Sequence, residues 1–248
     1  AIGLIARSAL RSGSYEKLEK VLAGVSGPSA RPLRATLAYE RGDLDALAKI
    51  AREVQPGEDA DGVIKTRLAL LRGDSVVPSA TLEALKKSDT VAGELCAVDG
   101  WLLLGETAKA RATVDAWPDA STNPGRALRR ARVLRAEGSY AEASKALEAA
   151  AESSPVLFER ILVEAEIPTD RPHALSLVDD RLGKLRPYVE AYVLARMDDT
   201  AKATRKLEGV VVPGFDAPLA LRVAAALAFG EIADTERGEP LVRVLHEK

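Results

Sequence analysis

The side chains best suited to acid–base, nucleophilic or metal chemistry are few in this 248-residue chain and lie far apart. There are two histidines, His173 and His246, and one cysteine, Cys96. The sequence has no His-Glu-x-x-His spacing, no paired cysteines and no glycine-rich phosphate loop. It therefore predicts no metal site and no cofactor, and we expect the protein not to be an enzyme.

Each of these side chains has a structural explanation. His173 falls at a predicted helix-packing position, where a hydrogen-bonded structural histidine is more common than a ligand or a base. Cys96 lies within a predicted helix, so we expect a small buried residue rather than a reactive thiol. The acidic pairs at 179–180 and 198–199 fall at predicted helix ends or turns, where carboxylates accept hydrogen bonds from free backbone N–H groups.

The composition indicates which classes of partner to expect. The net charge is −2 and only 4% of the residues are aromatic, so bulk electrostatics predict no nucleic-acid partner. No apolar run reaches the length of a membrane span, which predicts no direct membrane insertion. The chain starts with AIGLIARSAL, without Met or a leader. We expect a piece of a longer or processed protein, either cytoplasmic or periplasmic.

Glycines recur after predicted helices at nearly constant intervals. The first five, Gly13, Gly42, Gly73, Gly105 and Gly138, are 29 to 33 residues apart. Glycine readily adopts the left-handed conformation that ends a helix. Three further periods reach Gly230 and predict turns near Pro168 and Asp198. Eight helix pairs follow, over residues 1–25, 29–54, 60–87, 89–117, 124–154, 155–183, 187–210 and 216–247.

Two columns of side chains keep this period. Seven residues before each turn stand Ala6, Ala35, Thr66, Val98, Ala131, Ile161, Ala191 and Val223, all small or apolar. Twelve residues after each turn, seven of the eight residues are apolar and Asp180 is the exception. Small and apolar side chains at fixed positions allow paired helices to pack closely, so the pattern predicts an all-α fold.

The stretch 127–155 carries the fullest motif: Ala131, Gly138, Tyr140, Ala143, Leu147, Ala150 and Pro155. It resembles the tetratricopeptide repeat, a helix-turn-helix unit of about 34 residues. The resemblance implies one domain over 1–248, a right-handed superhelical solenoid of about eight antiparallel helix pairs. HEAT-like solenoids are the alternative fold, but they lack the Gly-x-Tyr turn at 138–140.

In that family, the first helices of the pairs line a concave groove that binds proteins or peptides. The resemblance therefore implies a non-enzymatic interaction scaffold, of the kind found in bacterial envelope, secretion, motility or signalling assemblies. The alternative is a regulatory or dimerisation domain of a larger kinase or transcription regulator. The family's Lys/Asn clamp for a terminal carboxylate is absent here.

The groove positions implied by the resemblance are Arg7, Tyr39, Arg67, Asp99, Arg132, Arg135, Phe158, Tyr188 and Tyr192. Arginines suit carboxylates and exposed aromatic rings suit apolar anchors, so the predicted partner is a protein or peptide with an acidic segment. The other interpretation is that the arginines pair with Asp99, Glu40 and Glu166 and only keep the groove soluble.

Overall fold

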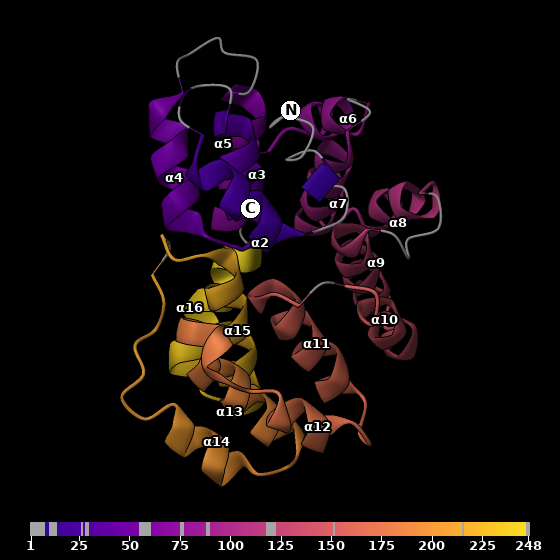
Figure 1. Ribbon diagram of the computed structural model, residues 1–248. Coiled ribbons are helices and arrows are strands. Elements are labelled where there is room, and N and C mark those ends of the chain that lie inside the picture. The colour runs from indigo at the N-terminus through magenta and orange to yellow at the C-terminus, as the bar shows by residue number, and fades with distance from the viewer. Residues whose placement is uncertain are drawn as a thin grey trace.

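The computed structural model describes residues 8–9, 14–25, 27, 30–54, 61–74, 77–87, 90–117, 123–150, 152–214 and 216–246, with side chains placed up to residue 241. Within these ranges the chain forms helices and no β-strand (Figure 1). The predicted all-α class is confirmed.

The helices are short and follow one another closely along the chain. Their bounds are α2 Tyr15–Ala23, α3 Arg31–Glu40, α4 Leu44–Glu53, α5 Asp61–Arg72, α6 Ser79–Lys87, α7 Val91–Leu103, α8 Thr107–Asp115, α9 Pro124–Ala136, α10 Tyr140–Leu147, α11 Ser154–Glu166, α12 Arg171–Ser176, the 3-10 helix η3 Asp180–Leu185, α13 Arg186–Arg196, α14 Thr200–Lys206, α15 Leu219–Glu231 and α16 Thr235–His246.

One backbone turn recurs between helices. A residue with positive φ ends the first helix, and the next residue donates its N–H to the carbonyl five residues earlier, as Asp43 does to Ala38 at 2.8 Å. This is the Schellman motif. The residues with positive φ are Gly42, Gly73, Gly105, Gly138, Asp198 and Ala233. The predicted turns are confirmed at the first four of these positions and at Asp198, while Gly13 lies outside the described residues.

Two predicted turns are wrong in register. Gly230 lies inside α15, and the turn is formed three residues later by Ala233, with φ of 56°. Pro168 forces the preceding Ile167 into an extended conformation, with ψ of 111°. The Schellman bond is therefore missing there, and α12 starts one residue later than the period predicts. Consequently Ala174 is the buried residue of α12 and His173 is exposed.

The first helix of each pair contacts the first helix of the next pair. The contacts run from α3 to α5, α7, α9, α11, α13 and α15 in turn; we call these seven helices the first-helix row. The row returns on itself because α15 also contacts α5, so the yellow C-terminal helices lie against the indigo N-terminal ones in Figure 1.

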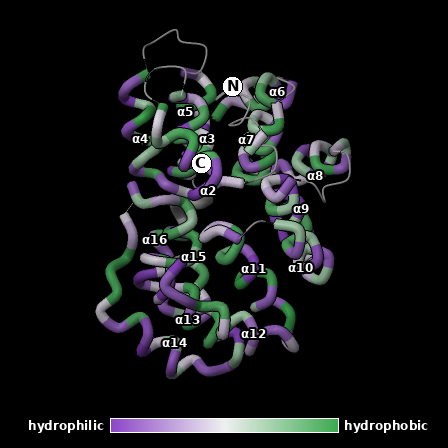
Figure 2. The backbone as a smooth tube through the Cα atoms, viewed as in Figure 1, coloured by the Kyte–Doolittle hydropathy of each residue, from purple (hydrophilic) through white to green (hydrophobic). Residues whose placement is uncertain are grey.

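Buried apolar side chains pack between these helices. Figure 2 marks the apolar stretches of the helices in green, for example along α15. Ala35, Val98, Ala131, Ile161 and Ala191 have no exposed surface. The column of small residues seven places before each turn is therefore confirmed as buried at these positions. In the last pair the corrected turn puts Ala226, exposed by 8%, in this column in place of Val223.

Candidate functional site

The largest group of polar side chains on the first-helix row is centred on Arg129 of α9. Only 2% of Arg129 is exposed. Its two terminal nitrogens donate to the Glu40 carboxylate of α3, at 2.6 and 3.0 Å. Nε and Nη2 also donate to Oδ2 of Asp99 on α7, at 3.0 and 2.7 Å. One guanidinium thus joins three helices through two carboxylates.

Two tyrosines complete the hydrogen bonding of these carboxylates. Tyr39 donates to Asp99 at 2.7 Å and Tyr15 donates to Glu40 at 3.1 Å. Burial, with help from the neighbouring carboxylates, raises the pKa of both tyrosines. Both hydroxyls therefore remain protonated donors at any physiological pH.

Asp99 is ionised although its surroundings are poor in water. Burial would raise its pKa, but the charges of Arg129 and Arg132 and the hydrogen bonds from Arg129 and Tyr39 outweigh burial, so the pKa lies below its usual value. Burial likewise opposes the charge on Arg129, yet Asp99 and Glu40 raise its pKa well above the usual range.

The group extends along α9 towards solvent. Arg132 donates to Oδ1 of Asp99 at 2.8 Å and lies 3.5 Å from Glu159 of α11, which Arg135 also contacts. The exposed fraction of the side chain rises from 3% at Arg129 to 26% at Arg132 and 33% at Arg135. We call this set of six residues, Glu40, Asp99, Arg129, Arg132, Arg135 and Glu159, the arginine network.

Arg67 of α5 lies beside the network without a carboxylate partner. Only 3% of it is exposed, and it has no ion pair among the described residues. It donates to Thr36 at 2.7 Å and to the carbonyl of Ala92 at 3.4 Å, and its Nε has no hydrogen-bond partner in the part of the chain that the structure describes. Its guanidinium lies 5.7 Å from the centre of the Tyr39 ring, a cation–π distance.

The nine predicted groove residues divide into three sets. Tyr39, Arg67, Asp99, Arg132 and Arg135 come together in or beside the arginine network. Phe158, Tyr188 and Tyr192 lie on α11 and α13. Arg7 lies outside the described residues. The binding role of all nine stays a prediction.

The expectation that the aromatic residues are exposed is wrong. Phe158, Tyr188 and Tyr192 are exposed by 7, 4 and 3%, because they pack in the apolar core between α11, α13 and α15. Tyr188 meets Phe229 edge to face, with ring centres 6.1 Å apart, and donates to the carbonyl of Val211. Tyr192 donates to Glu166.

The pairing expected under the alternative interpretation is found in part. Arg132 pairs with Asp99, and Glu40 pairs with Arg129. Glu166 pairs at 2.9 Å with Arg196. These pairs occupy Glu40, Asp99 and Glu166, whereas no carboxylate among the described residues binds Arg67 or the terminal nitrogens of Arg135.

Sequence reasoning missed Arg129 and Glu159. A signal for Arg129 is present, because Arg129, Arg132 and Arg135 are spaced three apart and so lie along one side of α9. Glu159 gives no comparable signal, since an isolated glutamate in an apolar helix could face either solvent or a cation. Its 2% exposure depends on the position of α9.

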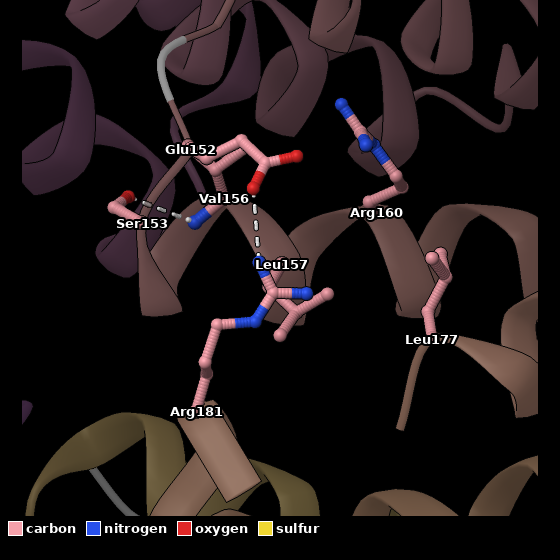
Figure 3. Close-up of a pocket in the computed structure, with 7 residues that line it drawn as sticks. All are labelled: Glu152, Ser153, Val156, Leu157, Arg160, Leu177 and Arg181. Carbon is pink, nitrogen blue, oxygen red and sulfur yellow. Dashed lines mark hydrogen bonds and ion pairs between the residues drawn. The ribbon is translucent and has the colours of Figure 1, made fainter. Parts of the chain in front are cut away.

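One cavity in the described part of the chain lies beside α11. It has a volume of about 30 Å³, that of a single water molecule, and opens between the start of α11 and the end of α12 (Figure 3). It is lined by Glu152, Ser153, Val156, Leu157, Arg160, Leu177 and Arg181. Arg181 and Glu152 pair with each other at 2.9 Å at its mouth.

The structure also shows the surroundings of Cys96 and His173, the two described residues best suited to nucleophilic or acid–base chemistry. Cys96 is fully buried, as predicted, and burial raises the pKa of its thiol to about 12. His173 is exposed rather than packed, and its Nδ1 lies 2.7 Å from Glu164. No group of three potential metal ligands occurs among the described residues. None of the described helices has the length and apolarity needed to cross a bilayer.

Comparison with protein-family models, with curated proteins and with solved structures found no match to this chain. Its function must therefore be argued from the geometry above.

Proposed function

We propose that the chain is a non-enzymatic protein-interaction scaffold, built as a tetratricopeptide-like α-solenoid of eight helix pairs. The observation that carries this proposal is a Schellman turn at six positions of the described chain, 31 to 35 residues apart except across Pro168. Each turn is preceded by a helix on which the residue seven places before the turn is small or apolar and buried. Repeats of this size bury their apolar faces against their neighbours and build extended surfaces used for binding.

The partner we propose is a protein segment rich in carboxylates, bound at the outer end of the arginine network. Arg135 contacts Glu159 through Nε, and no described residue bonds to its terminal nitrogens. Arg132 and Arg135 share that one carboxylate and keep 26 and 33% of their side chains exposed. Arginine forks bind carboxylates in a bidentate manner, so a partner carboxylate fits here.

The charge balance favours the same partner. The network pairs three arginines with three carboxylates, and Arg67 beside it adds a cation without an ion pair in the described residues. The local surplus is therefore positive although the whole chain carries a net charge of −2. Such a local field attracts acidic segments, and the attraction weakens as salt is added.

The experiment uses fluorescent peptides with runs of Asp and Glu, paired with peptides of identical length in which Asn and Gln replace them. We expect anisotropy to detect binding of acidic peptides only, with affinity falling as salt rises. Arg135→Gln is expected to weaken binding about tenfold, the effect of losing one charged hydrogen-bonded pair. Lys145→Gln is the matched control, because it also replaces one positive charge with glutamine, at an exposed position on α10.

Equal binding of the acidic and amide peptides would contradict the proposed partner. So would equal affinity of Arg135→Gln and Lys145→Gln. Arg132 still lies 3.5 Å from Glu159 in the Arg135→Gln variant, so this variant leaves no buried carboxylate without a cation.

A further inference from the structure

The contact that closes the first-helix row is made by residues far apart in the sequence. Arg222 of α15 donates to the carbonyl of Arg72, the last residue of α5, across 150 positions of the chain. Leu219, at the start of α15, packs beside it over Gly73. Figure 1 shows α15 reaching the N-terminal helices at this point.

Gly73 makes this close approach possible. A Cβ atom at Gly73 would lie 2.7 Å from Nη2 of Arg222 and 2.7 Å from Cδ1 of Leu219. Real Cβ atoms essentially never show contacts of that length, so a side chain at this position would displace the ends of Arg222 and Leu219, the two side chains that make the contact. The turn also needs the positive φ of 68° that glycine adopts without strain.

Arg222 is an unusual residue for such a contact. It is exposed by only 4%, has no ion pair among the described residues, and its Nε has no partner. Its position at the C-terminal end of α5 is favourable, because the free carbonyls there attract a cation. Even so, burial lowers its pKa, and the charge of Asp74 opposes this only in part.

The closing contact therefore differs from the other contacts of the row. Elsewhere in the described row, buried cations have several partners: Arg129 has two carboxylates, and Arg67 has the Thr36 hydroxyl, the Ala92 carbonyl and the Tyr39 ring. At α5 and α15 the described hydrogen-bond partner of the Arg222 guanidinium is the single carbonyl of Arg72. Burying a charge with so few partners is costly, which favours separation at this contact.

We propose that the α5–α15 contact is a latch that opens in solution, separating α15 from α5 while the helices themselves stay folded. Opening breaks the bond from Arg222 to the Arg72 carbonyl and returns the guanidinium to water. It also opens the first-helix row to a partner; that consequence rests on the proposed function, whereas the opening itself does not.

The test compares two glycine substitutions at equivalent turns. Gly73→Ala and Gly105→Ala place the same methyl group at nearly the same φ, 68° and 70°, but nothing lies within 4 Å of a Cβ at Gly105. Backbone strain is thus matched, and only Gly73→Ala crowds the latch. Hydrogen exchange of the α15 amides and the maximum dimension from X-ray scattering are the measurements.

We expect Gly73→Ala to speed exchange in α15 about tenfold relative to Gly105→Ala and to increase the maximum dimension, with unchanged helix content by circular dichroism. Leu219→Ala removes part of the contact without crowding and is expected to act in the same direction. It keeps the test decisive if Gly73→Ala does not fold.

Arg222→Met separates a latch from a permanent structural contact. If the buried charge favours opening, methionine holds the contact closed and slows exchange in α15 about tenfold. Faster exchange in Arg222→Met would overturn the proposal, as would equal exchange and scattering for the two glycine variants. Peptide binding is not measured, so failure here is distinct from failure of the proposed function.

Discussion

Replacing Arg129 with methionine tests whether the arginine network is buried as described. Methionine replaces the apolar stem of arginine but not the guanidinium, so it removes the four hydrogen bonds to Glu40 and Asp99. Glu40 then keeps only Tyr15 as a donor among its described contacts, while Asp99 keeps Tyr39 and Arg132.

The size of the effect follows from burial. The side chains of Arg129, Glu40 and Asp99 are exposed by 3, 4 and 10%. Removing one partner of a buried ion pair costs about 3–5 kcal/mol, because the remaining charge is left without compensation. An exposed pair costs less than about 1 kcal/mol, so Arg111→Met, whose side chain is 41% exposed in its pair with Asp115, is the control.

The stability lost in Arg129→Met is expected to be larger at pH 7 than at pH 4. In the wild type the pKa of Asp99 is lowered, so its contribution to stability is present above the unfolded pKa and is lost as the pH falls through the folded pKa. Without Arg129 the main opposing charge is gone and burial dominates, so the folded pKa of Asp99 rises. The variant then regains stability as acid protonates this carboxyl, and the difference from wild type shrinks between pH 7 and pH 4.

Urea unfolding followed by circular dichroism, repeated at pH 7 and pH 4, measures both effects. We expect a clearly lower urea midpoint for Arg129→Met at pH 7 and a smaller difference at pH 4. If Arg129→Met loses no more stability than Arg111→Met at pH 7, the network is solvated and the reasoning fails. A difference that grows towards pH 4 would refute the charge argument even if the variant were unstable.

Three further predictions follow from packing, backbone conformation and thiol ionisation. Gly100→Ala should lower the thermal midpoint, at a cost of about 1–3 kcal/mol, because its Cβ would lie 2.4 Å from the fully buried Leu82; an unchanged midpoint would mean that Leu82 moves freely. Ala233→Gly should stabilise the chain by about 0.5–1 kcal/mol in urea unfolding, because glycine relieves the strain of φ at 56°; Ala228→Gly inside α15 should destabilise it. Burial raises the pKa of the Cys96 thiol to about 12, so Cys96 should react with a thiol reagent at pH 8 only after denaturant is added. Rapid reaction of the native protein would show that the site opens.

The turns show what the sequence could predict and where it misled. Glycine at 42, 73, 105 and 138 marks the left-handed residue of each turn, and aspartate at 198 tolerates the same conformation. Nothing local marks Ala233, because alanine disfavours positive φ and Gly230 nearby is the more attractive candidate. The extended residue before Pro168 follows from a known restriction, but its effect on the start of α12 depends on how the next helix packs.

The membership of the candidate site was predictable in part, and its exposure was not. The resemblance places Tyr39, Asp99 and Arg132 on the same row of helices, and they do come together, but it does not include Arg129 or Glu159. Whether a side chain on that row meets water depends on contacts that local sequence does not encode. Glu40 and Arg129 meet across 89 positions and α5 meets α15 across 150. Tyr188 and Tyr192 are buried by packing between α11, α13 and α15, whereas the periodic pattern alone would leave them in an open groove.

The arginine network also bears on how similar helix pairs find their correct neighbours. A buried ion pair is no more stabilising than well-packed apolar side chains of similar volume, so stability alone does not account for Arg129. Pairs that share one turn and one apolar pattern could dock in several orders, a recognised hazard of repeat chains. Glu40 on α3 and Asp99 on α7 both pair with Arg129 on α9, and another order of docking would leave these charges buried without partners. Charge complementarity therefore favours this arrangement by penalising the alternatives, while the exposed end at Arg132 and Arg135 keeps charge available to a partner.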